Sequence, residues 1–130
     1  MNVVAAGDFV GYLVSLNVTN VLVSIGSPYK DNNGGSSGKV RLYVYSDSTW
    51  KQFSQYTGEI ASRESALSVS MNLAGDRVAI GSHYKDIHGN NSGHVGIHGF
   101  DGIAWKKIGQ ELRGDVATDR FGHAVSLNSK

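Results

Sequence analysis

The chain has 130 residues, of which 40% are hydrophobic, enough for one domain with a buried core. Twelve basic and eleven acidic side chains give a net charge of +1 without any long basic run, so the composition argues against nucleic-acid binding. There is no cysteine, which excludes disulfides, and no apolar run approaches the roughly 18 residues of a membrane span.

Glycine and proline usage favours short strands over helices. The chain has 17 glycines and one proline, Pro28, a balance typical of many tight turns. Nowhere does an apolar period of 3.6 residues persist for the ~10 residues that a helix needs. The composition therefore predicts an all-β protein.

Four strands are predicted in the first part of the chain, at residues 11–17, 21–27, 39–46 and 50–56. The second, "VLVSIGS", is almost continuously apolar, as in strands buried on both faces. The third, "KVRLYVYS", alternates with period 2, and the fourth, "WKQFSQY", is less apolar and suits an outer edge. Connectors rich in Asn, Asp and Gly separate them.

The sequence of this four-strand unit then repeats further along the chain. Residues 8–57 align with 63–112 at an offset of 55 without a gap, and 17 of the 50 pairs are identical. After one inserted residue, "DRFGHAVSLN" echoes the "DFVGYLVSLN" that begins at residue 8. We place repeat 1 at about 8–62, repeat 2 at about 63–118 and the start of repeat 3 at 119–130.

Four antiparallel strands repeated every ~55 residues are typical of β-propeller blades. The prediction for residues 1–130 is a single propeller segment of about two blades plus one strand. Propellers close with ~4–8 blades, so an open unit leaves apolar faces exposed. We expect either a piece of a longer propeller or a chain that self-associates through these faces, with the third-repeat strand completing a neighbour's blade.

The most unusual repeated segment joins the second and third strands: "GSPYKDNNGGSSGKV" at 26–40 and "GSHYKDIHGNNSGHV" at 81–95. Glycine suits its positive φ angles, and the side chains of the equivalent pairs Asp31/Asp86 and Ser37/Ser92 are expected to bond the loop's own backbone. The alternative is ligand contact by the loop residues Asp31, Asn33, Asp86 and His88.

Several motifs resemble the FG-GAP repeats of integrin-α-like propellers. Phe121-Gly122 corresponds to the FG pair, Ile25-Gly26-Ser27-Pro28 to the GAP segment, and "SGKVRLYVY" to the strand that follows it. The FG pair degenerates to Val10-Gly11 and Ser65-Ala66 in the first two repeats. The resemblance implies a propeller fold and a binding or adhesion function at the extracellular face or cell surface, although these residues include no signal peptide.

The calcium site of that family is not expected here. Calcium-binding members carry an acidic loop between the first two strands, whereas this chain has "NVTN" and "NLAGDR", with Asp76 as the single acid. Calcium takes six to eight oxygen ligands, several of them carboxylates. The five histidines invite a zinc hypothesis, but their counterparts in repeat 1 are not ligands, so we expect no metal or other cofactor.

The sequence contains no spacing typical of a catalytic triad, a paired-carboxylate site or a phosphate loop, so no enzymatic activity is expected. Trp50 and Trp105 recur at one blade position, where an indole packs between blades or stacks on a sugar. We predict a non-catalytic module that binds a protein or glycan ligand at its loops. The alternatives are a lectin-like propeller and the non-catalytic part of a propeller enzyme.

Overall fold

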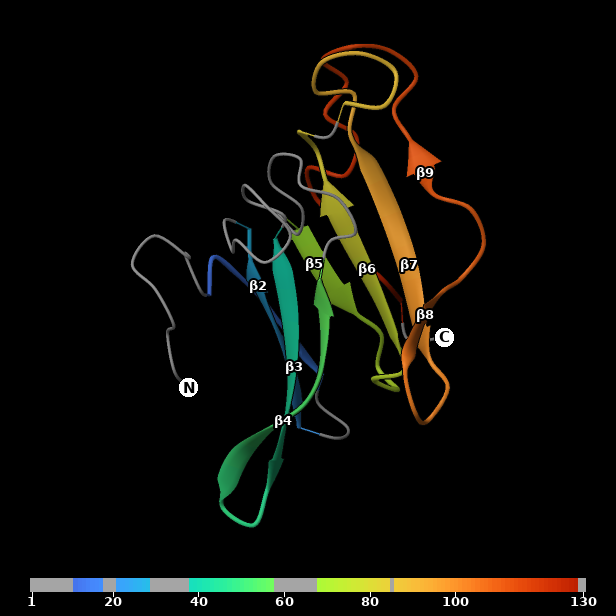
Figure 1. The fold of residues 1–130 in the computed structure, drawn as a ribbon. Coiled ribbons are helices and arrows are strands. Elements are labelled where there is room, and N and C mark those ends of the chain that lie inside the picture. Colours follow the sequence, from blue (N-terminus) through green and yellow to red (C-terminus); the bar gives the residue numbers. More distant parts are fainter. Residues whose placement is uncertain (1–10, 18–20, 29–37, 58–67, 85, 129–130) are drawn as a thin grey trace.

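The computed structural model describes residues 11–17, 21–28, 38–57, 68–84 and 86–128. These residues form two antiparallel sheets and no helix, which confirms the all-β prediction (Figure 1). The strands are β1 (Leu13–Asn17), β2 (Leu22–Ser27), β3 (Lys39–Ser46), β4 (Thr49–Thr57), β5 (Ser68–Met71), β6 (Arg77–Ser82), β7 (His94–Phe100), β8 (Trp105–Lys107) and β9 (Leu112–Arg113).

Each repeat forms one sheet with the same strand order. The first sheet runs β1-β2-β3-β4, and the second runs β5-β6-β7-β8 with β9 also beside β7. The register repeats as well, because Val14 lies opposite Ile25 and Val69 lies opposite Ile80. The two sheets stand side by side in Figure 1, each a meander of neighbouring strands.

The fourth strand of repeat 2 differs from its prediction. The strand predicted at 50–56 has its counterpart at 105–111 by the 55-residue offset, but β8 ends at Lys107 and pairing with β7 resumes only at β9. Between these pairs, residues 108–111 lie opposite only two residues of β7, so this strand has two extra residues. At the corresponding place in repeat 1, β4 has one extra residue, Phe53. The residue inserted between repeats therefore lies within this strand, which corrects the gapless alignment through 112.

The core lies between the two sheets. On β3, Val40 and Leu42 turn toward the second sheet, as the period-2 pattern predicts, and both are fully buried. Val40 packs with Val78 and Ile80, while Leu42 packs with other residues of both sheets. Burying one such side chain stabilises the fold by roughly 1.5–3 kcal/mol, so this layer is what joins the repeats.

Trp105 packs against both of these clusters. Its ring also lies 5.4 Å from Phe100, the residue paired with it across β7 and β8. The predicted packing of an indole between the repeats is thus confirmed for Trp105. A third cluster, formed by Val23, Ile25 and Tyr43, lies on the opposite face of the first sheet.

The start of repeat 3 was expected to be a strand, but among the described residues its sheet pairing is one parallel bridge, between Gly93 and Phe121. The segment nevertheless packs on the second sheet as β5 packs on the first. The amide of Met71 donates to Ser15 Oγ (3.1 Å), and the amide of Leu127 donates to Ser70 Oγ (2.9 Å). Ser15 and Ser70 are equivalent, so the junction between repeats recurs in atomic detail.

Two glycines, Gly81 and Gly122, allow the start of repeat 3 to approach the second sheet closely. A Cβ on Gly81 would lie 2.2 Å from the carbonyl oxygen of Gly122, and a Cβ on Gly122 would lie 2.5 Å from that of His94. The carbonyl of Gly122 also accepts a hydrogen bond from Ser68 Oγ (2.7 Å). Gly122 therefore packs on Gly81, the counterpart of Gly26 in repeat 1.

Replacing Gly122 by Ala is expected to detach residues 119–128 from the second sheet. The methyl group would overlap backbone atoms, and φ at this position is +85°. Hydrogen exchange at the Leu127 amide should become markedly faster. The matched control is Gly109→Ala, which has a similar φ of +67° but open space around the Cβ. Equal acceleration in both variants would contradict this account.

Candidate binding groove between the two sheets

A groove of about 510 Å³ lies between the edge strand of the first sheet and the β7–β8 turn of the second. One wall is β4 and the other is the end of the turn together with the start of β8. Its lining consists of aromatic, amide and small side chains: Gln52, Phe53, Ser54, Gln55, Tyr56, Ile103, Ala104 and Trp105.

The wall formed by β4 is shaped by a β-bulge. The register between β3 and β4 shifts at Phe53, because Leu42 lies opposite Ser54 while Tyr43 lies opposite Gln52. Such a bulge re-aims a side chain and is common beside binding sites. Here Phe53 meets Phe100 of the second sheet edge to face, at 6.0 Å between ring centroids.

The opposite wall is held by one carboxylate. Asp101 Oδ1 accepts hydrogen bonds from the amides of Ile103 (3.0 Å) and Ala104 (2.9 Å), and Lys106 Nζ lies 2.5 Å from Oδ2. The hydrogen bond to Lys106 and those to the backbone hold the pKa of Asp101 well below its usual range. The turn thus presents Ile103, whose side chain is 91% exposed, at the edge of the groove.

The chemistry of the groove is neutral. None of its eight lining residues carries a formal charge at pH 7, so it offers nothing to balance a phosphate or a metal ion. The amides of Gln52 and Gln55 are exposed and hydrogen-bonded to each other, Nε2 to Oε1, at 3.3 Å. Amides beside aromatic faces suit an uncharged ligand with hydroxyl or amide groups.

The two tryptophans singled out from the sequence do not share a site. Trp105 lines the groove, with much of its ring packed between the sheets. Trp50 lies at the β3–β4 hairpin, where it is 40% exposed and its ring lies 5.2 Å from that of Tyr45. Only Trp105 is therefore placed to contact a ligand in the groove.

The second copy of the repeated loop uses its polar groups on the protein itself. Asp86 accepts a hydrogen bond from the amide of Asn91 (2.6 Å), and Ser92 Oγ accepts from the amides of Ile87 (3.2 Å) and His88 (3.0 Å). The expectation that Asp86 and Ser92 bond their own loop is confirmed. Asp31, Asn33 and Ser37 lie outside the described residues, so the backbone bonds expected of Asp31 and Ser37 stay predictions. The ligand contacts proposed for Asp31, Asn33, Asp86 and His88 also stay predictions.

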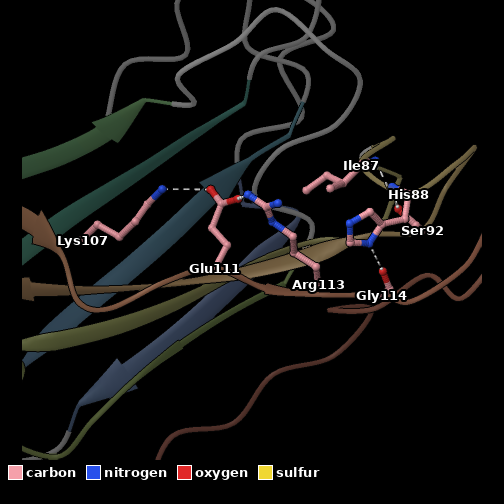
Figure 2. A network of polar contacts seen from close by, with 7 residues as sticks. All are labelled: Ile87, His88, Ser92, Lys107, Glu111, Arg113 and Gly114. Atoms are coloured by element: carbon pink, nitrogen blue, oxygen red, sulfur yellow. Dashed lines mark hydrogen bonds and ion pairs between the residues drawn. The ribbon is translucent and has the colours of Figure 1, made fainter.

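The loop also holds the chain that leads into repeat 3. His88 Nδ1 lies 2.8 Å from the carbonyl oxygen of Gly114, while Glu111 nearby pairs with Lys107 and Arg113 (Figure 2). The carbonyls of residues 90, 91 and 92 accept from the amides of Thr118, Arg120 and Phe121 at 2.8–3.0 Å. The second copy of the loop thus anchors the segment that follows β9.

The sequence did not point to most residues of the groove. The fourth strand was assigned to an outer edge, and the pattern "WKQFSQY" does not reveal that Phe53 is bulged. The structure shows that the groove is lined by residues of both sheets, among them Gln52, Gln55 and Ile103. Two glutamines three positions apart on an edge strand are otherwise a common solvent-facing pattern.

A buried histidine lies where β6 ends beside the third repeat. The ring of His83 lies 4.2 Å from that of Tyr84 and 4.6 Å from that of His123, and Arg120 lies over the Tyr84 ring. His83 is 7% exposed, and its Nδ1 has no hydrogen-bond partner within the described part of the chain. Burial, with the nearby His123 and Arg120, lowers the pKa of His83.

Acidification is therefore expected to destabilise the fold through His83. A lowered pKa means that the folded chain binds this proton less readily than the unfolded chain. The free energy of unfolding should thus fall as pH drops below about 6.5, the ordinary histidine value. The His83→Phe variant keeps an aromatic ring. In urea unfolding, its free energy of unfolding should decrease less between neutral and acidic pH than that of the unmodified chain.

His88→Gln serves as the control for removing a histidine in general, because its ring contacts Gly114 rather than the His83 cluster. If His83→Phe leaves the pH dependence unchanged, groups other than His83 cause the loss of stability at acidic pH.

Within the described residues, no group of three or more His, Cys, Asp or Glu side chains is placed to hold a metal ion. The same part of the chain contains no helix long and apolar enough to cross a membrane. Comparison with protein-family models and with curated protein sequences found no match to this chain.

Proposed function

We propose that this chain is a non-catalytic binding module built from FG-GAP-like β-propeller repeats, acting at the extracellular face or cell surface. The proposal is carried by the repeated junction: two sheets of the same order meet through Ser15 and Met71, and a third unit begins through Ser70 and Leu127. A stack that continues in the same geometry is the arrangement from which propellers are built.

The groove between β4 and β8 is the proposed ligand site. It is open, it is formed by both repeats, and Asp101 fixes one wall while the Phe53 bulge fixes the other. A site between rigid strands keeps its shape before the ligand arrives, which lowers the entropy cost of binding.

A lectin-like function is the second candidate, favoured by the composition of the groove. Sugars are neutral polyols with one apolar face, and they bind through amide hydrogen bonds and aromatic contacts. Gln52 and Gln55 supply the amides, while Phe53 and Trp105 supply the aromatic edge. A protein ligand would use the same surface through exposed Ile103.

Neutral oligosaccharides are expected to bind this groove. A glycan array on the full chain would identify a ligand, and calorimetry would then compare variants. Gln55→Ala should weaken binding about two- to thirteenfold, the effect of losing one hydrogen bond of about 0.5–1.5 kcal/mol.

The matched control is Gln110→Ala, an exposed glutamine of repeat 2 that does not line the groove. If both substitutions weaken binding equally, the ligand does not bind in this groove. A blank array, together with no perturbation of groove amides by any glycan in NMR titrations, would reject the lectin candidate and leave the protein-binding one.

A further inference from the structure

Three basic side chains gather where the second sheet meets the start of repeat 3. His83 directly follows β6, while Arg120 and His123 belong to the segment that packs on this sheet. The ring of His123 lies 4.6 Å from that of His83, and the guanidinium carbon of Arg120 lies 5.7 Å from the centre of the Tyr84 ring. Arg120 and His123 are exposed, whereas His83 is buried. We call His83, Arg120 and His123 the basic cluster.

No acidic side chain balances the basic cluster. Within the described residues, Arg120 and His123 have no carboxylate partner. The acids nearest in sequence are engaged with the backbone: Asp119 accepts two amides, at 2.9 and 3.0 Å, and Asp86 accepts one at 2.6 Å. Burial lowers the pKa of His83, and the charges that add to this effect, on His123 and Arg120, are both positive.

His83 also lacks a partner for one of its ring nitrogens. The residue is 7% exposed, and its buried Nδ1 makes no hydrogen bond within the described part of the chain. A buried polar atom without a partner is destabilising, and native structures usually supply one. A ligand with several acceptor atoms, bound between the histidine rings and the guanidinium, would satisfy this nitrogen.

The backbone positions Arg120 before any ligand binds. Its φ of +50° lies in the left-handed region, which is uncommon for a residue with a side chain. The carbonyl of Asn91 accepts the amide of Arg120 at 2.9 Å, so the second copy of the repeated loop holds this conformation. Backbone strain of this kind clusters at binding sites and persists only where the surroundings enforce it. The place of the guanidinium over Tyr84 is therefore built into the loop.

The junction between repeats 1 and 2 has a different set of residues at the equivalent positions. Taken in the same order as the basic cluster, they are Pro28, Glu64 and Leu67. Pro28 is fully buried. An apolar side chain thus fits the position of His83, so packing alone does not account for a buried histidine there.

We propose that the basic cluster binds a sulfate or phosphate group, either as the free ion or as an ester carried by a larger ligand. Guanidinium and imidazolium groups donate charge-assisted hydrogen bonds to the oxygens of such anions. The cluster lies beside the start of β7, whereas the groove lies at the end of this strand (Figure 1). The two sites are separate, and this proposal does not rest on the neutral ligand proposed for the groove.

Site-resolved NMR titration with sodium sulfate, against sodium chloride at equal ionic strength, tests the site. At about pH 6, the ring resonances of His83 and His123 should shift saturably with a Kd of about 1 mM, the strength of about two charge-assisted hydrogen bonds. The backbone amides of Gln52 and Gln55 in the groove should not shift. Unfolding is not the readout, because sulfate also stabilises proteins by exclusion from their surface. The absence of a saturable shift in the folded chain overturns the proposal.

The affinity for sulfate should increase as the pH falls, because sulfate stays doubly charged while the histidines gain protons. A histidine with the ordinary pKa of about 6.5 is about 10% protonated at pH 7.5 and about 75% at pH 6. A site that needs one protonated ring should therefore bind sulfate about five- to tenfold more tightly at the lower pH. An affinity that does not change with pH contradicts the role given to the histidines.

Arg120→Gln should weaken sulfate binding at least about tenfold, the effect of losing one charge-assisted hydrogen bond. The matched control is Arg77→Gln, which removes the same charge from an exposed arginine at the other end of β6. His123→Leu should also weaken binding, and it suits the junction because Leu67 stands at the equivalent position. If Arg120→Gln and Arg77→Gln weaken binding equally, the effect is one of net charge and the proposal is wrong.

Glucose 6-sulfate distinguishes the two sources of the anion. If this ester binds more tightly than free sulfate, although it carries one charge fewer, the basic cluster recognises a group carried by a larger ligand. If free sulfate binds more tightly, the site serves the ion itself. Either result supports the site, and neither depends on whether a neutral ligand binds the groove.

Discussion

The junction between successive repeats is the contact on which the rest of the structure depends. A first-strand serine accepts an amide from the first strand of the next repeat, and Val40 and Leu42 close the layer beside it. The second sheet buries Val78 and Ile80 against the first sheet, and Val40 is buried in the same cluster. The hydrogen bond fixes the register of the junction, and apolar burial supplies its stability.

The second copy of the repeated loop holds the start of the third repeat in place. Its Ser92 hydroxyl satisfies two loop amides, and three successive loop carbonyls hold the chain that begins the third repeat. A loop of this kind needs glycine at Gly93, where φ is +79° and a Cβ would meet the backbone of Phe121. The need to dock the next repeat at one distance gives a physical reason for the loop to recur at a fixed spacing.

The groove is also a product of the junction. The bulge at Phe53 belongs to one repeat and the turn fixed by Asp101 to the other, so neither repeat contains the site alone. Its neutral lining favours ligands recognised by hydrogen bonding and shape. The junction also separates the two equivalent tryptophans, because Trp105 packs in the layer between the sheets whereas Trp50 is 40% exposed.

The sequence by itself determined the 55-residue period, the absence of helix in the described residues and the faces of β3, because these depend on local periodicity and turn chemistry. It also predicted that Asp86 and Ser92 bond their own loop. Only the tertiary structure decided where the inserted residue lies, and that residues 122–127 do not form a strand. The groove of Gln52, Gln55 and Ile103 was likewise decided there, because it arises between elements 50 residues apart, whose relative placement depends on packing across the sheets.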